Sequence, residues 1–113
     1  MTNSRAKGKR AELEVAAYLR NMGYKARRGI QYCGGPNSPD VIGLRGVHLE
    51  VKHVEQLNIH KAMDQSRKDS AIDELPVVVH RKNRTPWLVT MDIDSFMEMY
   101  DAYVQRRYGE ETE

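Results

Sequence analysis

The amino-acid sequence predicts an α/β domain in which a central mixed sheet is flanked by helices, in the order αβββαββα. Residues 5–22 repeat apolar side chains at helical spacing. Residues 40–52 form two short apolar segments around a tight turn, and two further apolar segments lie within 76–91. The chain of 113 residues is long enough for one domain, spanning 1–113, that buries its own core.

The first half of the chain is expected to supply one helix and three strands. The helix over 5–22 ends at Gly23, a residue typical of helix C-termini. A strand is expected over 24–29, and a loop over 30–39 because Gly, Pro, Asn and Ser lie close together there. The two strands of a hairpin then occupy 40–52.

The second half is expected to supply two strands and two helices. Asn58 can cap a helix over about 59–73, since its side chain accepts a hydrogen bond from the first turn. A strand with the sequence PVVVHR follows, and the turn KNRTP leads into a strand with the sequence WLVTM. Asp92 or Asp94 caps a last helix, which continues to about residue 108.

Gly46 decides the register of the predicted hairpin. With a two-residue turn, Asp40 would face away from Glu50. With a three-residue turn over 44–46, Gly46 takes the third position, where such a loop needs a left-handed residue and forms a bulge. Asp40 is then opposite Glu50, and Lys52, two residues along, points to the same face. We prefer this register because it places Gly46 where its conformational freedom is required.

The predicted pairing of Asp40 with Glu50 brings two carboxylates together. Their repulsion costs about 0.2–1 kcal/mol relative to a neutral pair. A divalent cation would convert that repulsion into binding, and oxygen donors without a His or Cys cluster favour Mg²⁺ or Mn²⁺ over Zn²⁺. Asp40 and Glu50 are therefore candidate metal ligands. In the alternative interpretation, Lys52 only neutralises one acid at a strand end.

Glu12 adds a third carboxylate on the first helix. At 100° per residue, one arc of this helix is apolar, and its members are Ala11, Val15, Ala16, Tyr18, Leu19 and Met22. Glu12 lies inside that arc, whereas Glu14 lies outside it. Because a lone buried carboxylate is costly, we expect Glu12 to pack beside the acids of the hairpin and to support the metal, directly or through water. The alternative is a glutamate at the edge of the arc whose carboxylate reaches solvent.

The charge of the chain is unevenly distributed. Residues 1–52 contain ten Lys and Arg against four Asp and Glu, a net charge of +6, whereas residues 53–113 contain eight against twelve, a net charge of −4. This asymmetry indicates either a surface that binds a polyanion or an ordinary solvated surface. The single cysteine, Cys33, excludes an internal disulfide, and no apolar run reaches the length of a membrane span. We therefore expect a soluble, cytoplasmic protein without a membrane partner.

Two segments resemble a known group of enzymes. Pro39 and Asp40, followed ten residues later by Glu50, Val51 and Lys52, resemble the PD-(D/E)-x-K signature of the restriction-endonuclease-like nucleases. The helix KGKRAELEVAAYL resembles the opening of archaeal-type Holliday junction resolvases, and small phage and prophage nucleases of this superfamily are an equally good match. The resemblance implies a single nuclease domain with a restriction-endonuclease-like core, encoded by a prokaryote or a phage.

The resemblance also implies roles for individual residues. Asp40 and Glu50 match the metal-binding acids, and the carbonyl of Val51 would be a further ligand to Mg²⁺ or Mn²⁺. Lys52 matches the catalytic lysine, which would orient the attacking water or stabilise developing charge. Glu12 matches the helix glutamate, which would hold a metal-bound water or a second ion.

DNA is the substrate that the resemblance implies. Five basic residues would contact the phosphates that flank the cut: Lys7, Lys9, Arg10, Arg27 and Arg28. Arg28, with Arg27 as its rival, matches the arginine that closes the first strand of the family. The implied reaction is Mg²⁺-dependent endonucleolytic hydrolysis of a DNA phosphodiester, selective for branched DNA.

Two departures from the resolvase pattern leave other functions open. The loop before Asp40 is longer than in the resolvases, and Leu13 replaces an arginine that follows the helix glutamate. The first alternative is a nicking or restriction-type nuclease without junction preference. The second is a non-catalytic module with a degenerate nuclease core that binds DNA. The third is an interaction domain in which the acids and the lysine form structural ion pairs.

The last helix and the histidines complete the predictions. Resolution of a four-way junction needs two cuts, so a resolvase requires a symmetric homodimer. The last helix has more apolar residues than one narrow stripe holds, and these could form the dimer interface or pack on the domain's own sheet: Phe96, Met97, Met99, Tyr100, Tyr103 and Val104. The four histidines lack zinc-like spacing and are interpreted as surface or strand residues: His48, His53, His60 and His80.

Overall fold

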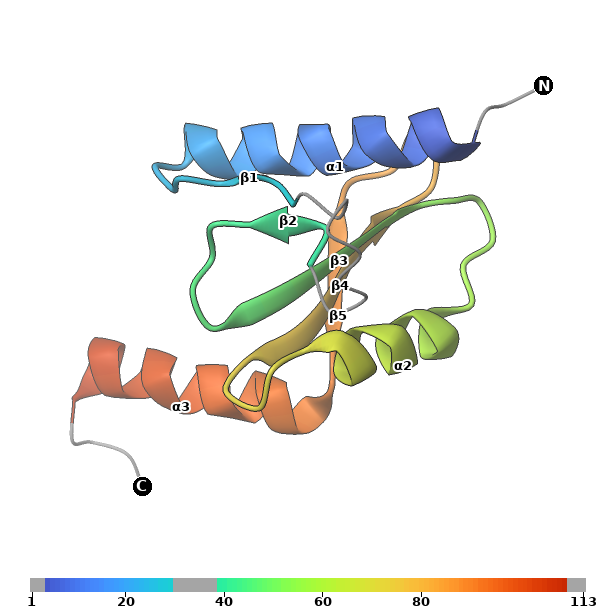
Figure 1. The fold of residues 1–113 in the computed structure, drawn as a ribbon. Coiled ribbons are helices and arrows are strands. Elements are labelled where there is room, and N and C mark those ends of the chain that lie inside the picture. The colour runs from blue at the N-terminus through green and yellow to red at the C-terminus, as the bar shows by residue number, and fades with distance from the viewer. Residues whose placement is uncertain (1–3, 30–38, 110–113) are drawn as a thin grey trace.

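The computed structural model describes residues 4–29 and 39–109, which form a five-stranded sheet with helices on both faces (Figure 1). Helix α1 (Ser4–Asn21) covers one face of the sheet, and α2 (Ile59–Asp69) packs on the other. The remaining elements are β1 (Arg27–Arg28), β2 (Val41–Ile42), β3 (Val47–His53), β4 (Leu75–Arg81), β5 (Leu88–Met91) and α3 (Ile93–Tyr108). The predicted α/β class and the order αβββαββα are confirmed.

The sheet is mixed, as the sequence predicted. Its strands lie side by side in the order β1-β2-β3-β4-β5, so β1 and β5 form the two edges. Strands β3 and β4 are parallel, and the other neighbouring pairs are antiparallel. A parallel pair requires a crossover connection, and α2 provides it.

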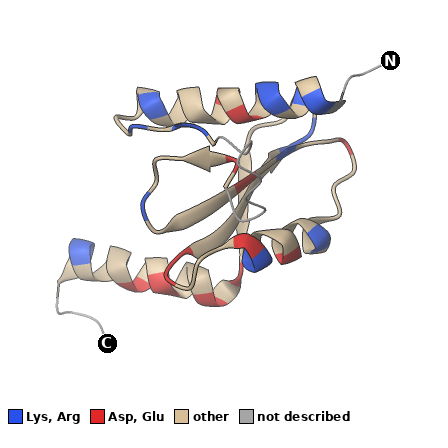
Figure 2. Ribbon diagram, viewed as in Figure 1, with Lys and Arg blue, Asp and Glu red and all other residues tan. Residues whose placement is uncertain are grey.

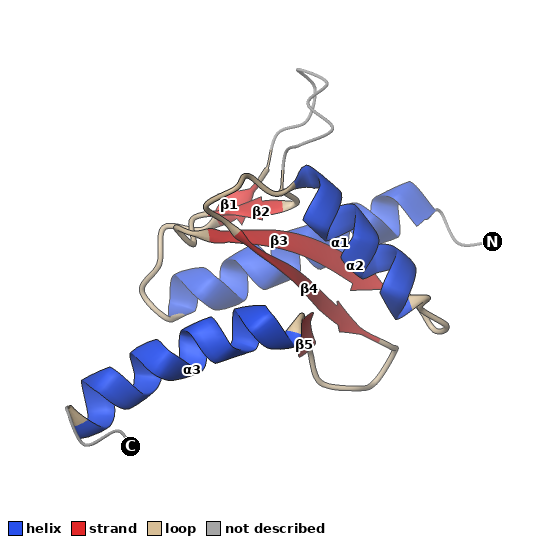
Figure 3. Cartoon of the chain, turned by 90° about the horizontal axis from the view of Figure 1, so that it is seen from below, coloured by secondary structure: helices blue, strands red, loops and turns tan. Residues whose placement is uncertain are grey.

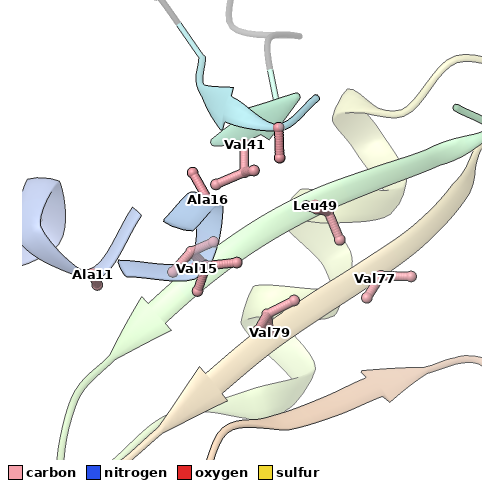
Figure 4. Close-up of a cluster of buried hydrophobic side chains, with 9 residues drawn as sticks. Ala11, Val15, Ala16, Val41, Leu49, Val77 and Val79 are labelled. Carbon is pink, nitrogen blue, oxygen red and sulfur yellow. The ribbon is translucent and has the colours of Figure 1, made fainter. Parts of the chain in front are cut away.

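Small and β-branched side chains form the main core between α1 and the sheet. Ala11 and Ala16 on α1 are almost fully buried, and their short side chains let the helix approach the strands closely. These residues and Val15 face a layer of strand residues (Figure 4), which consists of Val41, Leu49, Val51, Val77 and Val79. Alternation along β3 and β4 then directs the intervening residues to the other face, where α2 packs.

Helix α2 is fixed to that second face by apolar contacts and by one buried hydroxyl. Ala62 and Met63 pack against Val78. The Ser66 hydroxyl, which is fully buried, accepts a hydrogen bond from the Val77 amide at 3.1 Å. Asn58 caps the helix as predicted, because its side-chain oxygen accepts from the Lys61 amide at 3.0 Å.

Several predicted boundaries and burials differ from the structure. The strand predicted over 24–29 is reduced to Arg27–Arg28, because its partner β2 offers only two residues for pairing. The helix predicted over 59–73 ends at Asp69. Tyr18 and Met22 are both 60% exposed, since Tyr18 lies at the edge of the apolar arc and Met22 follows the last residue of α1.

Helix α3 begins where predicted but packs differently. Asp92 is its N-cap residue, yet the Asp92 carboxylate does not cap the helix, because it accepts two hydrogen bonds from Arg67 at 2.9 and 2.6 Å. Figure 3 shows α3 leading away from the end of β5, beyond the sheet. Ser95 is the residue of α3 that is buried, whereas most apolar side chains of this helix are exposed. These side chains therefore do not pack on the domain's own sheet.

Parts of the sequence-based description lie outside the described residues. The predicted loop over 30–39 is described only at Pro39, and Cys33 is among the positions left out. Within 4–29 and 39–109, no helix combines the length and the apolar character that crossing a membrane requires.

Candidate active site

The hairpin of β2 and β3 has the predicted register. Val41 pairs with Leu49, which is the register of a three-residue turn. The Val47 amide donates to the Leu44 carbonyl at 3.3 Å, and Gly46 has a φ of +87°, the left-handed conformation for which glycine was expected. Asp40 and Glu50 are the next residues beyond the Val41–Leu49 pair at this end of the ladder.

Beyond the end of β2, the Asp40 carboxylate accepts the next hydrogen bond from β3 in place of a backbone carbonyl. The Asp40 amide donates to the Leu49 carbonyl at 2.9 Å, and the next donor on β3, the Val51 amide, donates to the Asp40 carboxylate at 2.8 Å. In an extended strand the N–H and C=O of one residue point to the same side. The Val51 carbonyl is therefore directed toward the side of β3 on which Asp40 lies.

The charged groups around Asp40 act on its pKa. Asp40 is 9% exposed and Glu50 only 3% exposed. Burial and the neighbouring charge of Glu50 raise the pKa of Asp40 from 3.8 to about 6, and the charge of Glu12 adds to this rise. The hydrogen bond from Val51 and the charge of Lys52 act in the opposite direction. The other three predicted side chains of the site are thus within electrostatic reach of Asp40.

Glu12 and Glu14 have different environments, as the helical arc predicted. The Glu12 side chain is 17% exposed and accepts a hydrogen bond from Arg28 Nε at 2.6 Å. Glu14 is 48% exposed and instead accepts from the Trp87 indole at 3.1 Å and from Arg81 at 3.3 Å. Glu12 therefore faces the hairpin acids, and Glu14 faces β4 and the segment before β5.

Gly29 explains why Arg28 lies beside Glu12. The Gly29 amide donates to the Asp40 carbonyl at 2.9 Å. A Cβ atom at Gly29 would lie 2.2 Å from the Pro39 carbonyl oxygen, so no other residue fits without a shift of the backbone. This close approach holds the end of β1 against Asp40 and places Arg28, rather than its rival Arg27, on Glu12.

The basic residues predicted to bind DNA lie on one part of the surface. Figure 2 shows Lys and Arg along α1 and β1, and Asp and Glu along the first half of α3 on the opposite side. All five predicted residues are exposed or half-buried: Lys7, Lys9, Arg10, Arg27 and Arg28. The charge asymmetry of the sequence therefore corresponds to two different surfaces of the domain.

The chemistry of the donors fits a divalent cation. Asp40, Glu50 and the Val51 carbonyl offer hard oxygen atoms, and the pKa of Asp40 is raised first by burial and then by the charge of Glu50, both of which a bound cation would offset. A second group of possible metal ligands lies nearby. Within the described residues, His48, Glu50 and Asp69 each place one possible ligand atom within 4.8 Å of those of the other two. Glu50 thus lies near Asp40 and also near His48 and Asp69.

His48 lies in strand β3, one of the two placements that the sequence predicts for it, but its burial is not predicted. It is fully buried on the α2 side of β3, next to Glu50. The alternation of β3 contains the signal, because His48 shares its face with Glu50 and Lys52.

Comparison with known proteins supports the fold. No protein-family model and no curated protein matches the sequence. Among solved structures, the chain is similar to Hjc, a Holliday junction resolvase from the archaeal hyperthermophile Archaeoglobus fulgidus. The similarity has a TM-score of 0.51 and 22% identity, and it covers 75% of this chain and 72% of Hjc. At this identity it shows the fold alone, and the predicted central mixed sheet flanked by helices is the fold that the two chains share.

Replacement of Asp40 by Asn tests the burial of negative charge in the metal-free protein. With a folded-state pKa of about 6 against 3.8 unfolded, the contribution of Asp40 to wild-type stability falls as pH rises from about 4 to 6, by about 3 kcal/mol. Asn cannot ionise and still accepts from Val51. In urea denaturation with EDTA, Asp40→Asn should be the more stable protein at pH 8 and should lose that advantage near pH 4.

The control for this comparison is the exposed acid Asp73. Asp73→Asn should leave the pH dependence of stability close to that of the wild type. Parallel pH profiles for wild type and Asp40→Asn would show that Asp40 carries no such cost.

Proposed function

We propose that the protein is a Mg²⁺-dependent endodeoxyribonuclease that acts on branched DNA. The observation that carries this proposal is the buried pair of Asp40 and Glu50, with the Val51 carbonyl and Lys52 beside it. The similarity of the fold to a Holliday junction resolvase supports the choice of substrate. The basic surface of α1 and β1 supports a polyanionic ligand.

Asp40, Glu50 and the Val51 carbonyl are the proposed ligands of Mg²⁺, with Mn²⁺ as a substitute. A bound ion of this kind polarises a phosphoryl oxygen and lowers the pKa of a water molecule. Asp40 is oriented for this role by the Val51 amide, which donates to one of its carboxylate oxygens at 2.8 Å. Lys52, half-buried at the same end of β3, orients the water or stabilises the charge that develops on the phosphate.

Glu12 is proposed to hold a water molecule or a second ion on the α1 side. Its ion pair with Arg28 involves an arginine that is 41% exposed, so the pair is worth no more than about 1 kcal/mol. Glu12 can therefore exchange Arg28 for a cation at little cost. Arg28 would then be available to a DNA phosphate.

The remaining basic residues are proposed to position the duplex. Lys7, Lys9 and Arg10 on α1 and Arg27 on β1 reach solvent and would contact phosphates that flank the cut. Such contacts fix the orientation of DNA without reading its sequence, and they release counterions, so binding should weaken with salt.

A homodimer through α3 is proposed to supply the two active sites that a four-way junction requires. Phe96, Tyr100 and Tyr103 form one aromatic stripe, with successive ring centroids 6.3 Å apart, and each ring is about half exposed. Helix α3 is acidic in its first turn and basic in its last turn. Two copies packed antiparallel would therefore place opposite charges together along the aromatic stripe.

Cleavage assays with matched variants test the proposed reaction. Wild type should cut four-way junctions in Mg²⁺ faster than linear duplex, and Asp40→Asn should cut neither while still binding DNA, because a negative charge near the phosphate is removed. Glu12→Gln should lower the rate by about 10–100-fold, the effect of losing a group that supports a metal site. Glu14→Gln, two residues away, should lower it much less.

The outcomes of these assays separate the candidate functions. Equal rates on junctions and linear duplex, with Asp40→Asn inactive, would leave a nuclease without junction preference. Undiminished cleavage by purified Asp40→Asn would show that Asp40 is not part of the metal site that cleavage requires. DNA binding without any Mg²⁺-dependent cleavage by wild type would indicate the non-catalytic module.

Replacement of Tyr100 by Glu tests the proposed dimer. Wild type should sediment with a mass of about 26 kDa, twice the 13.0 kDa of the chain. Tyr100→Glu should shift the protein toward the monomer, because it places charge in the aromatic stripe. Tyr24→Glu, at an equally exposed tyrosine after α1, should leave the mass unchanged. A monomeric wild type, or a dimeric Tyr100→Glu variant, would exclude α3 as the interface.

A further inference from the structure

His48 is buried between β3 and α2, and within residues 4–29 and 39–109 neither of its ring nitrogens has a hydrogen-bond partner. Its side chain is 0% exposed. Nε2 lies 3.7 Å from Glu50 Oε1, and Nδ1 lies 3.6 Å from Glu74 Oε1, both beyond hydrogen-bond distance. Burying polar atoms without partners is unfavourable, so this arrangement needs an explanation.

Asp69 approaches the same point from α2. One ligand atom each from His48, Glu50 and Asp69 lies within 4.8 Å of the other two. Asp69 is the last residue of α2, where the helix dipole disfavours a negative charge. Two carboxylates thus converge on the imidazole of His48, and Glu50 among them is only 3% exposed. A cation would satisfy all three groups.

We propose that His48, Glu50 and Asp69 form a site for a divalent transition-metal ion of the Zn²⁺ type, on the α2 side of β3. An imidazole donor favours Zn²⁺ over Mg²⁺, whose ligands are oxygen atoms. Tetrahedral ligands about 2.1 Å from zinc are about 3.4 Å apart. The 3.7 Å between His48 Nε2 and Glu50 requires only a small adjustment to meet this value.

Glu74 completes the geometry expected of a metal-bound histidine. Such a histidine usually donates its second ring N–H to a carboxylate, which fixes the ring and its tautomer. Glu74 faces Nδ1 and is itself held by the Ala71 amide, which donates to Glu74 Oε1 at 2.8 Å. With Nδ1 protonated and directed at Glu74, Nε2 has its lone pair toward Glu50.

The neighbouring contacts fix the distance between α2 and β3. Ser66, one helical turn before Asp69, is held against the strands by the Val77 amide, so the position of Asp69 is set by the fold. Glu50 is shared with the proposed Mg²⁺ site, whereas His48 and Asp69 belong to the zinc site alone. The binding of zinc to His48 and Asp69 does not depend on nuclease activity, and it can be measured without DNA.

Zinc titration of the full chain in excess Mg²⁺ tests this site. Calorimetry should find one Zn²⁺ per chain, and X-ray absorption at the zinc edge should show an imidazole ligand. Asp69→Asn should lower the affinity at least as strongly as Glu74→Gln, for which a loss of about 10–100-fold is expected. Asp73→Asn, a nearby exposed acid, should leave the affinity unchanged. Asp69 is half-buried at a helix end, so its replacement should preserve the fold, as circular dichroism would verify.

Three results would overturn the proposal. The first is the absence of Zn²⁺ binding in Mg²⁺. The second is binding that Asp69→Asn leaves unchanged. The third is binding that Asp40→Asn abolishes and Asp69→Asn does not, because the zinc would then occupy the proposed Mg²⁺ site. None of these results depends on whether the protein cleaves DNA.

Discussion

The pairing of β2 with β3 is the constraint on which the rest of the site depends. Gly46 permits the three-residue turn that places Asp40 opposite Glu50, and the bond from the Val51 amide then orients the Asp40 carboxylate. A register shifted by one residue would send Asp40 to the other face of the sheet. The close approach of Gly29 to Pro39 attaches β1 to the same point, and with it Arg28.

The apolar core offsets the free-energy cost of burying Asp40 and Glu50 close to each other. Two acids with little exposure lie close together, and burial and the charge of Glu50 raise the pKa of Asp40, so ionising both acids costs stability. Valines and leucines on the α1 face of β3 and β4 are buried under α1, while α2 covers the opposite face. Strand β3 is therefore supported on both sides, which keeps Glu50 and its neighbour His48 in fixed positions.

Local signals in the sequence predicted most of this architecture. Helical periodicity separated Glu12 from Glu14, turn chemistry at Gly46 predicted the register, and Asn58 marked the start of α2. The failures depend on tertiary packing. The length of β1 is limited by its partner strand, the burial of His48 depends on where α2 lies, and no local pattern indicates that α3 leaves its apolar stripe exposed.

A crystal of the protein soaked in Mn²⁺ would test the central claim, that the hairpin holds two acids together to bind a cation. The anomalous signal of Mn²⁺ locates the ion without reference to activity. If the two acids bind the cation, the peak will lie between the carboxylates of Asp40 and Glu50 and the carbonyl of Val51. An ion bound elsewhere at saturating Mn²⁺, with none at Asp40 and Glu50, would show that the two acids are not a cation site.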